Sequence, residues 1–267
     1  MNEILNVKDL NYINIFKKFN IKIEKNKFIT ISGPNNSGKT TFLRIISKKI
    51  EIKNSILINN RLVELYDPFQ LAQNIKLISI DYGFSFIFKN VEDEIMFVID
   101  NKNNELTKEE KKEKFNKFLK DFKLTKYVSQ DPNLLDKKNQ LKIKLIIEII
   151  KKTNIILLDN VCSIMNREET IEFIEKLKYY QKQEKNTIIL ATNNLTITMY
   201  SDYLYILNNG EIVLEGKPID ILTKDNFINK IGLDLPFMVD LSVKLKDYDL
   251  IENIETDIDK MVGKLWK

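Results

Sequence analysis

The stretch GPNNSGKT, residues 33–40, has the spacing G-x-x-x-x-G-K-T and decides the fold. It follows the apolar run FITIS and precedes TTFLRIISKKI, which has an apolar face, so it lies between an expected strand and an expected helix. Glycines let such a loop curl until backbone N–H groups point inward, and the helix N-terminus adds positive potential. An ordinary glycine turn is the alternative, but the strand, the helix and the Lys-Thr pair together favour a cradle for phosphates.

The side chains at the end of this loop predict a nucleoside triphosphate site. Lys39 is expected to reach the β- and γ-phosphates, and the Thr40 hydroxyl is expected to bind Mg²⁺. Asp159 ends the apolar run IILLD and is predicted to be the second metal ligand, although an aspartate at a strand end is often only a turn former. We therefore predict ATP and Mg²⁺ as cofactors. The predicted nucleotide-binding residues of the loop are Gly33, Pro34, Asn35, Asn36, Ser37, Gly38, Lys39, Thr40 and Thr41.

The composition is typical of a globular protein and shows no marked charge preference. Of the 267 residues, 43% are hydrophobic and 30% charged, and the net charge is only +4. The lysines are scattered among glutamates, so no nucleic-acid partner is expected. One cysteine excludes an internal disulfide and fits a reducing compartment, and the apolar runs are too short to span a bilayer. A cytoplasmic location is expected.

Strand-like and helix-like segments alternate along the chain, which predicts an α/β fold with parallel strands. ILNV, FNIKI, NIILLD and TIILATNN have strand patterns, whereas LKIKLIIEIIKK and REETIEFIEKLKYYQKQ have helical ones. YLYILNNGEIVLEG predicts a hairpin turning at Asn209 and Gly210. A mainly helical insertion is expected near residues 82–139, with a capping box of Thr107 and Glu110 before one helix. The core-facing residues expected on that helix are Phe115, Phe118 and Phe122.

The order of these segments resembles the ATP-binding subunits of ABC transporters over essentially the whole chain. It is most similar to the paired ATPases of energy-coupling factor (ECF) importers, and the tail GLDLPFMVDLSVKLK, residues 232–246, makes the resemblance specific. VEDEIMF at residues 91–97 and YLYILNNGEIVLEGKP at residues 203–218 also match the family. The resemblance implies a P-loop NTPase of the ABC ATPase type, with an ATP-binding domain over residues 1–218. It also implies a C-terminal extension over residues 219–267 that helps pair two such subunits.

The positions that the resemblance identifies as catalytic carry other residues here. Asn160 stands at the position of the catalytic glutamate, Asn193 at that of the switch histidine, and Asp81 at that of the glutamine that senses Mg²⁺ and the attacking water. Asn166 replaces the aspartate of the loop after the magnesium strand. Because a positioned general base contributes about 10²- to 10⁴-fold, hydrolysis at this chain's own site is expected to be weak or absent. A weak role for Asn160 in positioning water is the alternative.

The family's L-S-G-G-Q signature, which grips the γ-phosphate bound by the partner subunit, is also replaced. Its glycines let backbone N–H groups approach the phosphate, and lysine side chains would obstruct that approach. The two lysines either offer their ammonium groups to the phosphate instead or form a solvated pair at a helix start. The signature positions fall on Leu135, Asp136, Lys137, Lys138 and Asn139.

Two further surfaces follow from the resemblance. The nucleotide base usually stacks on an aromatic residue near the first strand, and here Tyr12 is the best candidate, since the aligned position is Asn14. A strand tyrosine packed in the core is the alternative. GFSFIF, residues 83–88, lies where the family's groove receives the coupling helices of the membrane subunit, although core packing explains these residues as well.

We therefore expect a degenerate ATP-binding subunit of an ECF-type importer on the inner face of the cell membrane. It would pair with a catalytic ABC ATPase and integral membrane components to drive uptake of a vitamin or other micronutrient. One alternative is a catalytically active transporter ATPase whose machinery is replaced. Another is a soluble ABC protein of translation or DNA repair, which would usually carry a second cassette or a long coiled coil.

Overall fold

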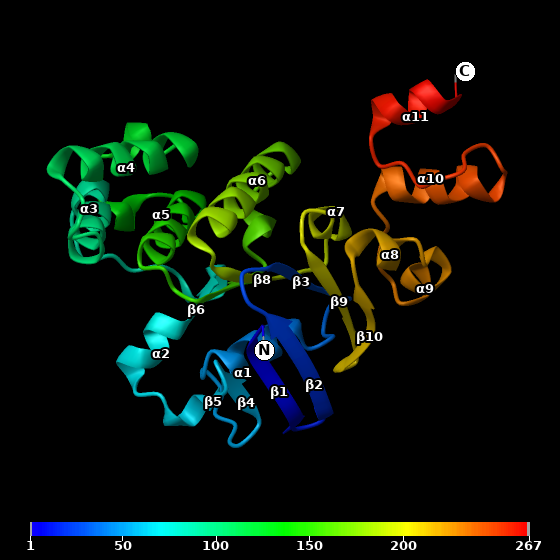
Figure 1. Cartoon of the computed structure of the whole chain (residues 1–267), viewed down its shortest axis with the longest axis horizontal. Helices are drawn as coiled ribbons and strands as arrows, with labels where there is room; N and C mark the ends of the chain where they lie inside the picture. The colour runs from blue at the N-terminus through cyan, green and yellow to red at the C-terminus, as the bar shows by residue number, and fades with distance from the viewer. Residues whose placement is uncertain (1, 266–267) are drawn as a thin grey trace.

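The computed structural model describes residues 2–265 and contains two sheets (Figure 1). The larger sheet contains β3 (Phe28–Ser32), β6 (Ile75–Ser79), β7 (Ile155–Asp159), β8 (Thr187–Thr192), β9 (Tyr203–Asn208) and β10 (Glu211–Gly216), in the order β10-β9-β3-β8-β7-β6. The smaller, antiparallel sheet contains β1 (Glu3–Tyr12), β2 (Phe16–Glu24), β4 (Ile56–Ile58) and β5 (Arg61–Leu62), in the order β2-β1-β4-β5. The predicted α/β fold is confirmed.

The central strands of the larger sheet run parallel, which decides where the functional side chains meet. β3 pairs with β8 and β9, and β7 pairs with β6 and β8, all in parallel. Every residue of β3, β7 and β8 is buried, as expected for parallel strands covered on both faces. In this register Asp159 lies opposite Ser79 on one side and Ala191 on the other. The loops that follow these strands therefore share one edge of the sheet.

Helices cover the sheet and extend from it at both ends (Figure 1). α1 (Lys39–Ile46) follows the phosphate loop and buries the expected apolar face. The remaining helices are α2 (Pro68–Asn74), α3 (Val91–Lys102), α4 (Lys108–Asp121), α5 (Lys137–Ile150), α6 (Arg167–Glu184), α7 (Leu195–Thr198), α8 (Pro218–Leu222), α9 (Asp225–Lys230), α10 (Phe237–Asp247) and α11 (Ile258–Leu265). None of these helices is long and apolar enough to cross a bilayer.

The helical region of residues 91–150 forms a lobe of its own in Figure 1, built from α3, α4 and α5. The predicted capping box is present, because Thr107 and Glu110 exchange side-chain to backbone hydrogen bonds at the start of α4. The three phenylalanines after it are at most 4% exposed and belong to the core. Their role in packing is confirmed, while the boundary near residue 139 falls inside α5.

The elements that were not predicted from sequence include α2, α7 and β6. β6 is a five-residue edge strand, and its sequence IKLIS includes the exposed Lys76, so the apolar pattern is short and interrupted. The hairpin between β9 and β10 was predicted and is confirmed, with φ of 47° at Asn209 and 77° at Gly210.

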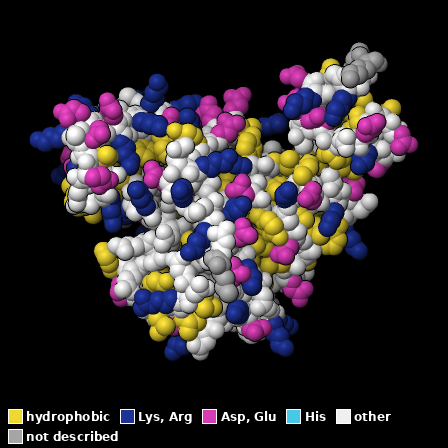
Figure 2. All heavy atoms as spheres, in the orientation of Figure 1, with side chains coloured by type: hydrophobic (Ala, Val, Ile, Leu, Met, Phe, Trp, Pro, Cys, Tyr) yellow, Lys and Arg dark blue, Asp and Glu magenta, His cyan; other side chains and the backbone are white. Residues whose placement is uncertain are grey.

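The C-terminal segment after β10 is helical, as expected, and packs on the outer strands of the larger sheet. Its buried residues join Leu204 and Ile206 of β9 in a separate apolar cluster. α10 contributes Val239 and Val243 to this cluster. α10 and α11 keep several large apolar side chains exposed, among them Phe237 at 71% and Ile258 at 62%. Over the face drawn in Figure 2, positive and negative side chains are interspersed, in agreement with the small net charge.

Candidate nucleotide site

The phosphate loop ends at a helix start that no side chain caps. Gly38 is the N-cap of α1 with φ of 107°, it makes no side-chain capping bond, and no acidic residue lies in the first turn. An uncapped helix start offers backbone N–H groups to an anion, and the helix dipole favours negative charge there. The loop between β3 and α1 therefore fits a phosphate chain.

Glycine is required in this loop because other backbone lies against it. A Cβ added at Gly33 would lie 2.0 Å from the Leu207 carbonyl oxygen of β9. At the tip of the β9–β10 hairpin, a Cβ added at Gly210 would lie 1.6 Å from the Ile15 carbonyl oxygen. The Gly210 N–H donates to the Ser37 carbonyl at 3.0 Å, so the hairpin fixes the phosphate loop from behind.

Lys39 places its ammonium group over the loop. Nζ donates to the carbonyl oxygens of Gly33 and Pro34, each at 2.8 Å, and to the Ser37 hydroxyl at 3.2 Å. Burial lowers the pKa of this ammonium group, and the Asp159 carboxylate partly opposes that shift. A phosphate would therefore supply a charged partner that the neutral carbonyl groups do not.

Thr40 and Asp159 bring two oxygen ligands together. The Thr40 hydroxyl donates to Asp159 Oδ1 at 2.9 Å, and Asp159 is only 3% exposed. Burial raises the pKa of the Asp159 carboxyl, the charge of Asp81 adds to this, and the bond from Thr40 opposes it. Mg²⁺ binds hard oxygen ligands and usually takes one or two protein groups with water and phosphate oxygens, so the pair fits this ion. Bound there, Mg²⁺ would neutralise phosphate charge.

A cleft of about 680 Å³ joins these residues at the edge of the sheet. It is lined by residues 35–41, 159–160 and 191–193, together with Ile15. Asn160 and Asn193, predicted from sequence, therefore meet the phosphate loop and Asp159. Tyr12 is not among the lining residues and packs partly buried against the core, so base stacking on Tyr12 stays a prediction. Ile15 was missed by sequence reasoning, because an isoleucine gives no signal for nucleotide binding.

The cleft holds little that can accept a proton. Among its described lining residues Asp159 is the sole carboxylate, and it is already bonded to Thr40. The backbone of Asn160 is fixed, with φ of 51°, by a bond from its N–H to the Ala191 carbonyl at 3.2 Å. Its side-chain amide hydrogen-bonds but does not accept a proton at neutral pH. The cleft is therefore suited to binding more than to general-base catalysis.

Asp81 lies just outside this cleft and contacts α1. It is in the short helical turn of Ile80–Tyr82 that follows β6, and its Oδ2 lies 3.9 Å from a guanidinium nitrogen of Arg44. The guanidinium carbon of Arg44 also lies 5.4 Å from the centre of the Tyr82 ring. Arg44 was not predicted to have a role, and it joins this turn to the helix of the phosphate loop.

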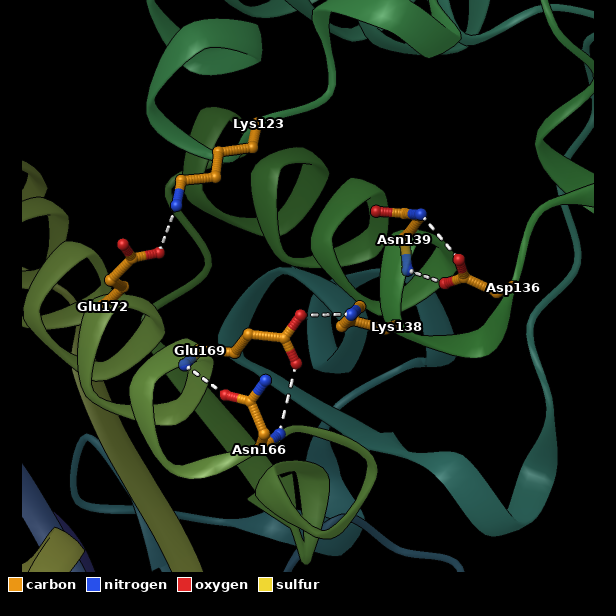
Figure 3. A network of polar contacts seen from close by, with 7 residues as sticks. All are labelled: Lys123, Asp136, Lys138, Asn139, Asn166, Glu169 and Glu172. Carbon is orange, nitrogen blue, oxygen red and sulfur yellow. Dashed lines mark hydrogen bonds and ion pairs between the residues drawn. The ribbon is translucent and has the colours of Figure 1, made fainter.

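The signature positions lie at the start of α5, where the chain's own side chains bind one another (Figure 3). Asp136 caps the helix: its two carboxylate oxygens accept from the Asn139 backbone N–H and from the Asn139 side-chain amide, each at 2.8 Å. Lys138 forms an ion pair with Glu169 of α6, and this contact raises the pKa of Lys138. Leu135 is partly buried against the core, and Lys137 is exposed.

Within the chain Lys138 is therefore bound by Glu169, whereas Lys137 is exposed. Both interpretations of the two lysines, contact with a partner's phosphate or a solvated pair, stay predictions. Asn166 caps α6 and forms a capping box with the same Glu169 (Figure 3). The spacing N-x-x-E of the capping box is visible in the sequence, but the contact across helices is not.

The apolar segment at residues 83–88 combines buried and exposed side chains. Phe86 is 9% exposed, belongs to the core, and lies under the Lys144 ammonium at 4.2 Å from its ring centre. Ile87 is 84% exposed. The core-packing alternative therefore holds for Phe86, whereas Ile87 is an exposed apolar side chain of this segment.

The chain matches the family model described as ABC transporter over residues 16–163. Among named proteins it is 26% identical over 258 residues to the energy-coupling factor transporter ATP-binding protein EcfA1 of Mesomycoplasma hyopneumoniae strain J, covering 95% of this chain and 91% of that protein. It is 24% identical over 253 residues to the energy-coupling factor transporter ATP-binding protein EcfA of Enterococcus faecium, covering 94% and 90%.

Solved structures agree on the fold. The structure of cbiO1 from Clostridium perfringens, described as part of the ABC transporter complex cbiONQ, has a TM-score of 0.72 at 19% identity and covers 92% of this chain and 100% of that one. A dimeric ATP-binding cassette, MJ0796, bound to ADP and phosphate, has a TM-score of 0.65 at 19% identity, covering 80% and 98%.

Proposed function

The chain belongs to the ABC transporter family, and on that premise we propose that it is a nucleotide-binding subunit of an ECF-type importer with little hydrolysis of its own. Its named relatives include ECF transporter ATP-binding proteins, which it matches over about nine tenths of their length. The importer would take up a vitamin or another micronutrient, selected by a separate membrane component.

One observation carries the proposal. The uncapped start of α1, Lys39 and the Thr40–Asp159 pair lie in one cleft, whose lining also includes Asn160 and Asn193. These groups fit a triphosphate with Mg²⁺, and the sole carboxylate among the described lining residues, Asp159, is already bonded to Thr40, which supports binding with little general-base catalysis. ATP bound here would act mainly through its binding energy.

We further propose that the chain pairs with a catalytic ABC ATPase. The predicted division is an ATP-binding domain over residues 1–218 and a pairing extension over residues 219–267. The exposed apolar residues of α10 and α11 support this division, since such patches mark protein contacts. Release from the closed pair would then depend on hydrolysis at the partner's site.

Steady-state phosphate release tests the enzymatic half of the proposal. The isolated chain should release phosphate near background, and Asn160→Glu alone should restore little, because Asn193 and Asp81 remain. Turnover at ordinary ABC ATPase rates that Lys39→Ala abolishes would show instead that the chain is a catalytically active transporter ATPase.

Affinity purification from native membranes tests the assembly half. It should recover one ABC ATPase with a glutamate base and one integral membrane protein. Truncation before Gly232 should weaken the first contact, and Ile87→Glu should weaken the second. Phe237→Glu is the variant on the C-terminal extension that matches Ile87→Glu, because Phe237 is also an exposed apolar side chain. Recovery of ribosomes or DNA-repair proteins without a membrane partner would contradict the proposal.

A further inference from the structure

A second cavity lies between α4, α5 and α6, away from the phosphate loop. It has a volume of about 370 Å³, and its lining contains five lysines and four carboxylates. None of its residues lines the nucleotide cleft. We refer to it as the seam cavity, because its lining combines residues of the helical lobe with residues of α6.

Most of the charges around the seam cavity are paired across it. Lys123, from the turn after α4, binds Glu172 of α6, and Lys138 of α5 binds Glu169 (Figure 3). Lys176 of α6 lies 3.0 Å from Asp121 at the end of α4, and Asp121 also accepts from the Tyr180 hydroxyl. Three of the four carboxylates are therefore neutralised by one lysine each.

Two lysines of the lining, Lys142 and Lys120, and one carboxylate, Glu175, have no ion pair in the described part of the chain. Glu175 is exposed, whereas Lys142 is not. Lys142 lies one turn after Lys138 on α5, is partly buried, and has no ion pair or side-chain hydrogen bond within residues 2–265. Burial lowers the pKa of its ammonium group and the nearby charge of Lys138 lowers it further, while the carboxylates of Glu169 and Asp136 partly oppose the shift. Like charges four residues apart on a helix destabilise it, and a partly buried cation without a partner is costly. An anion in the cavity would remove both penalties.

The rest of the lining suits a small organic anion. Lys120 of α4 is exposed and also has no described ion pair, so the lining holds two unpaired cations from different helices. Phe122, Phe173 and Met165 supply an apolar floor between them. The volume lies in the range of small-molecule pockets, which combine apolar walls with a few charged groups.

We propose that the seam cavity binds a small soluble molecule carrying a phosphate group, with Lys142 as its principal cation and Lys120 as the second. Lysine acts as a point charge for phosphate, which does not require the planar geometry that arginine would need. The apolar part of the ligand would rest on Phe122 and Phe173. Because the walls come from both sides of the seam, the ligand would hold the helical lobe against α6.

Equilibrium dialysis of the full chain against labelled inorganic pyrophosphate tests the proposal. The wild type should show two classes of site, Lys39→Ala should lose the one at the phosphate loop, and Lys142→Met should lose the one in the seam cavity. Losing a charge-assisted contact should weaken that class about 10-fold or more. Lys144→Met is the matched control, because Lys144 is also a partly buried lysine of α5 with a lowered pKa but does not line the seam cavity.

Lys142→Gln serves as a second variant if the methionine variant fails to fold. Anionic phospholipid vesicles are a separate probe. Any binding of the chain to these vesicles should be equal in the wild type and in the Lys142 variants. Three results would overturn the proposal: a single class of site in the wild type, two classes in both Lys142 variants, or a dependence on Lys142 seen only with vesicles.

Discussion

The N-termini of helices α1 and α5 differ in whether a side chain caps them. At α1 the N-cap is Gly38, no side chain caps the helix, and the nearby Lys39 and Thr40 present a cation and a hydroxyl. At α5 the N-cap is Asp136, whose carboxylate already accepts a hydrogen bond from the Asn139 N–H. A helix start binds an external anion only if its own N–H groups are not already satisfied. The difference indicates that the start of α1 is available to an external anion, whereas the start of α5 is satisfied by contacts within the chain.

The strongest test of this difference is Lys39→Ala at the phosphate loop. The variant should bind a fluorescent ATP analogue about 10- to 100-fold more weakly, because it loses a charge-assisted contact with the phosphates. Equilibrium titration with Mg²⁺ measures the effect, and Lys53→Ala, at an exposed site, is the control. Equal affinity in the Lys39 variant would remove the main support for the α1 side of the comparison.

Asp159→Asn, also in the nucleotide cleft, should have opposite effects on nucleotide binding and on the stability of the fold. It should weaken Mg²⁺-dependent nucleotide binding, about 10-fold, because one metal ligand loses its charge. Without ligand, however, the variant should melt at a higher temperature than the wild type at pH 7.5. A carboxyl whose pKa is raised by folding destabilises the fold once it is ionised, and asparagine can still accept the bond from Thr40.

The direction in which stability changes with pH follows from the raised pKa of Asp159. The stability advantage of Asp159→Asn should shrink as the pH falls through the raised pKa of Asp159, because the wild-type carboxyl then becomes neutral. Over that range the affinity of the wild type for Mg²⁺-nucleotide should fall as well. Thermal melts from pH 4 to pH 8 would check this, and an advantage that grows toward low pH would contradict it.

Asp136→Ala and Asn166→Ala should affect stability without affecting the nucleotide. Loss of a helix cap costs about 0.5–2 kcal/mol of unfolding free energy, and neither side chain lines the nucleotide cleft. Asn166→Gly should lower the unfolding free energy by only about a few tenths of a kcal/mol, which makes it a matched control. Chemical denaturation and ATP titration on the same samples would measure both. A large loss of ATP affinity in Asp136→Ala would mean that α5 acts on the nucleotide after all.

The smallest effect is expected from Lys138→Met. The Lys138–Glu169 pair is partly exposed, so its loss should lower the melting temperature slightly, and added salt should reduce the difference further. Lys137→Met, at the exposed neighbouring position, should change nothing measurable. If Lys138→Met instead alters the activity of a catalytic partner, the α5 face contacts nucleotide in the assembled pair.

The features that the sequence predicted are those governed by neighbouring residues. The loop at residues 33–40, the strand before Asp159 and the turn at Asn209 and Gly210 each follow from local spacing, and the structure contains all three. β6 was missed because its apolar pattern is five residues long and includes an exposed lysine. A short edge strand of this kind is defined by the strand it pairs with and not by its own residues.

The side-chain partners were beyond sequence reasoning because they depend on packing. Lys138 and Glu169 are 31 positions apart and meet only because α5 and α6 pack together. Arg44 and Asp81 meet because β6 ends beside α1. Likewise, Phe86 and Ile87 are adjacent apolar residues, and only the fold decides that the first is buried and the second exposed.

The hairpin tip behind the phosphate loop limits how this chain can be recombined with others. Gly210 and Ser37 are bonded through their backbones, and Gly33 lies against Leu207, although these pairs are far apart in sequence. A chimera that takes residues 1–200 from one homologue and the remainder from another would separate the two halves of this contact. Crossover points placed after Gly216 would keep both halves from a single parent, so such libraries should yield more folded, nucleotide-binding chains than crossovers placed before β9.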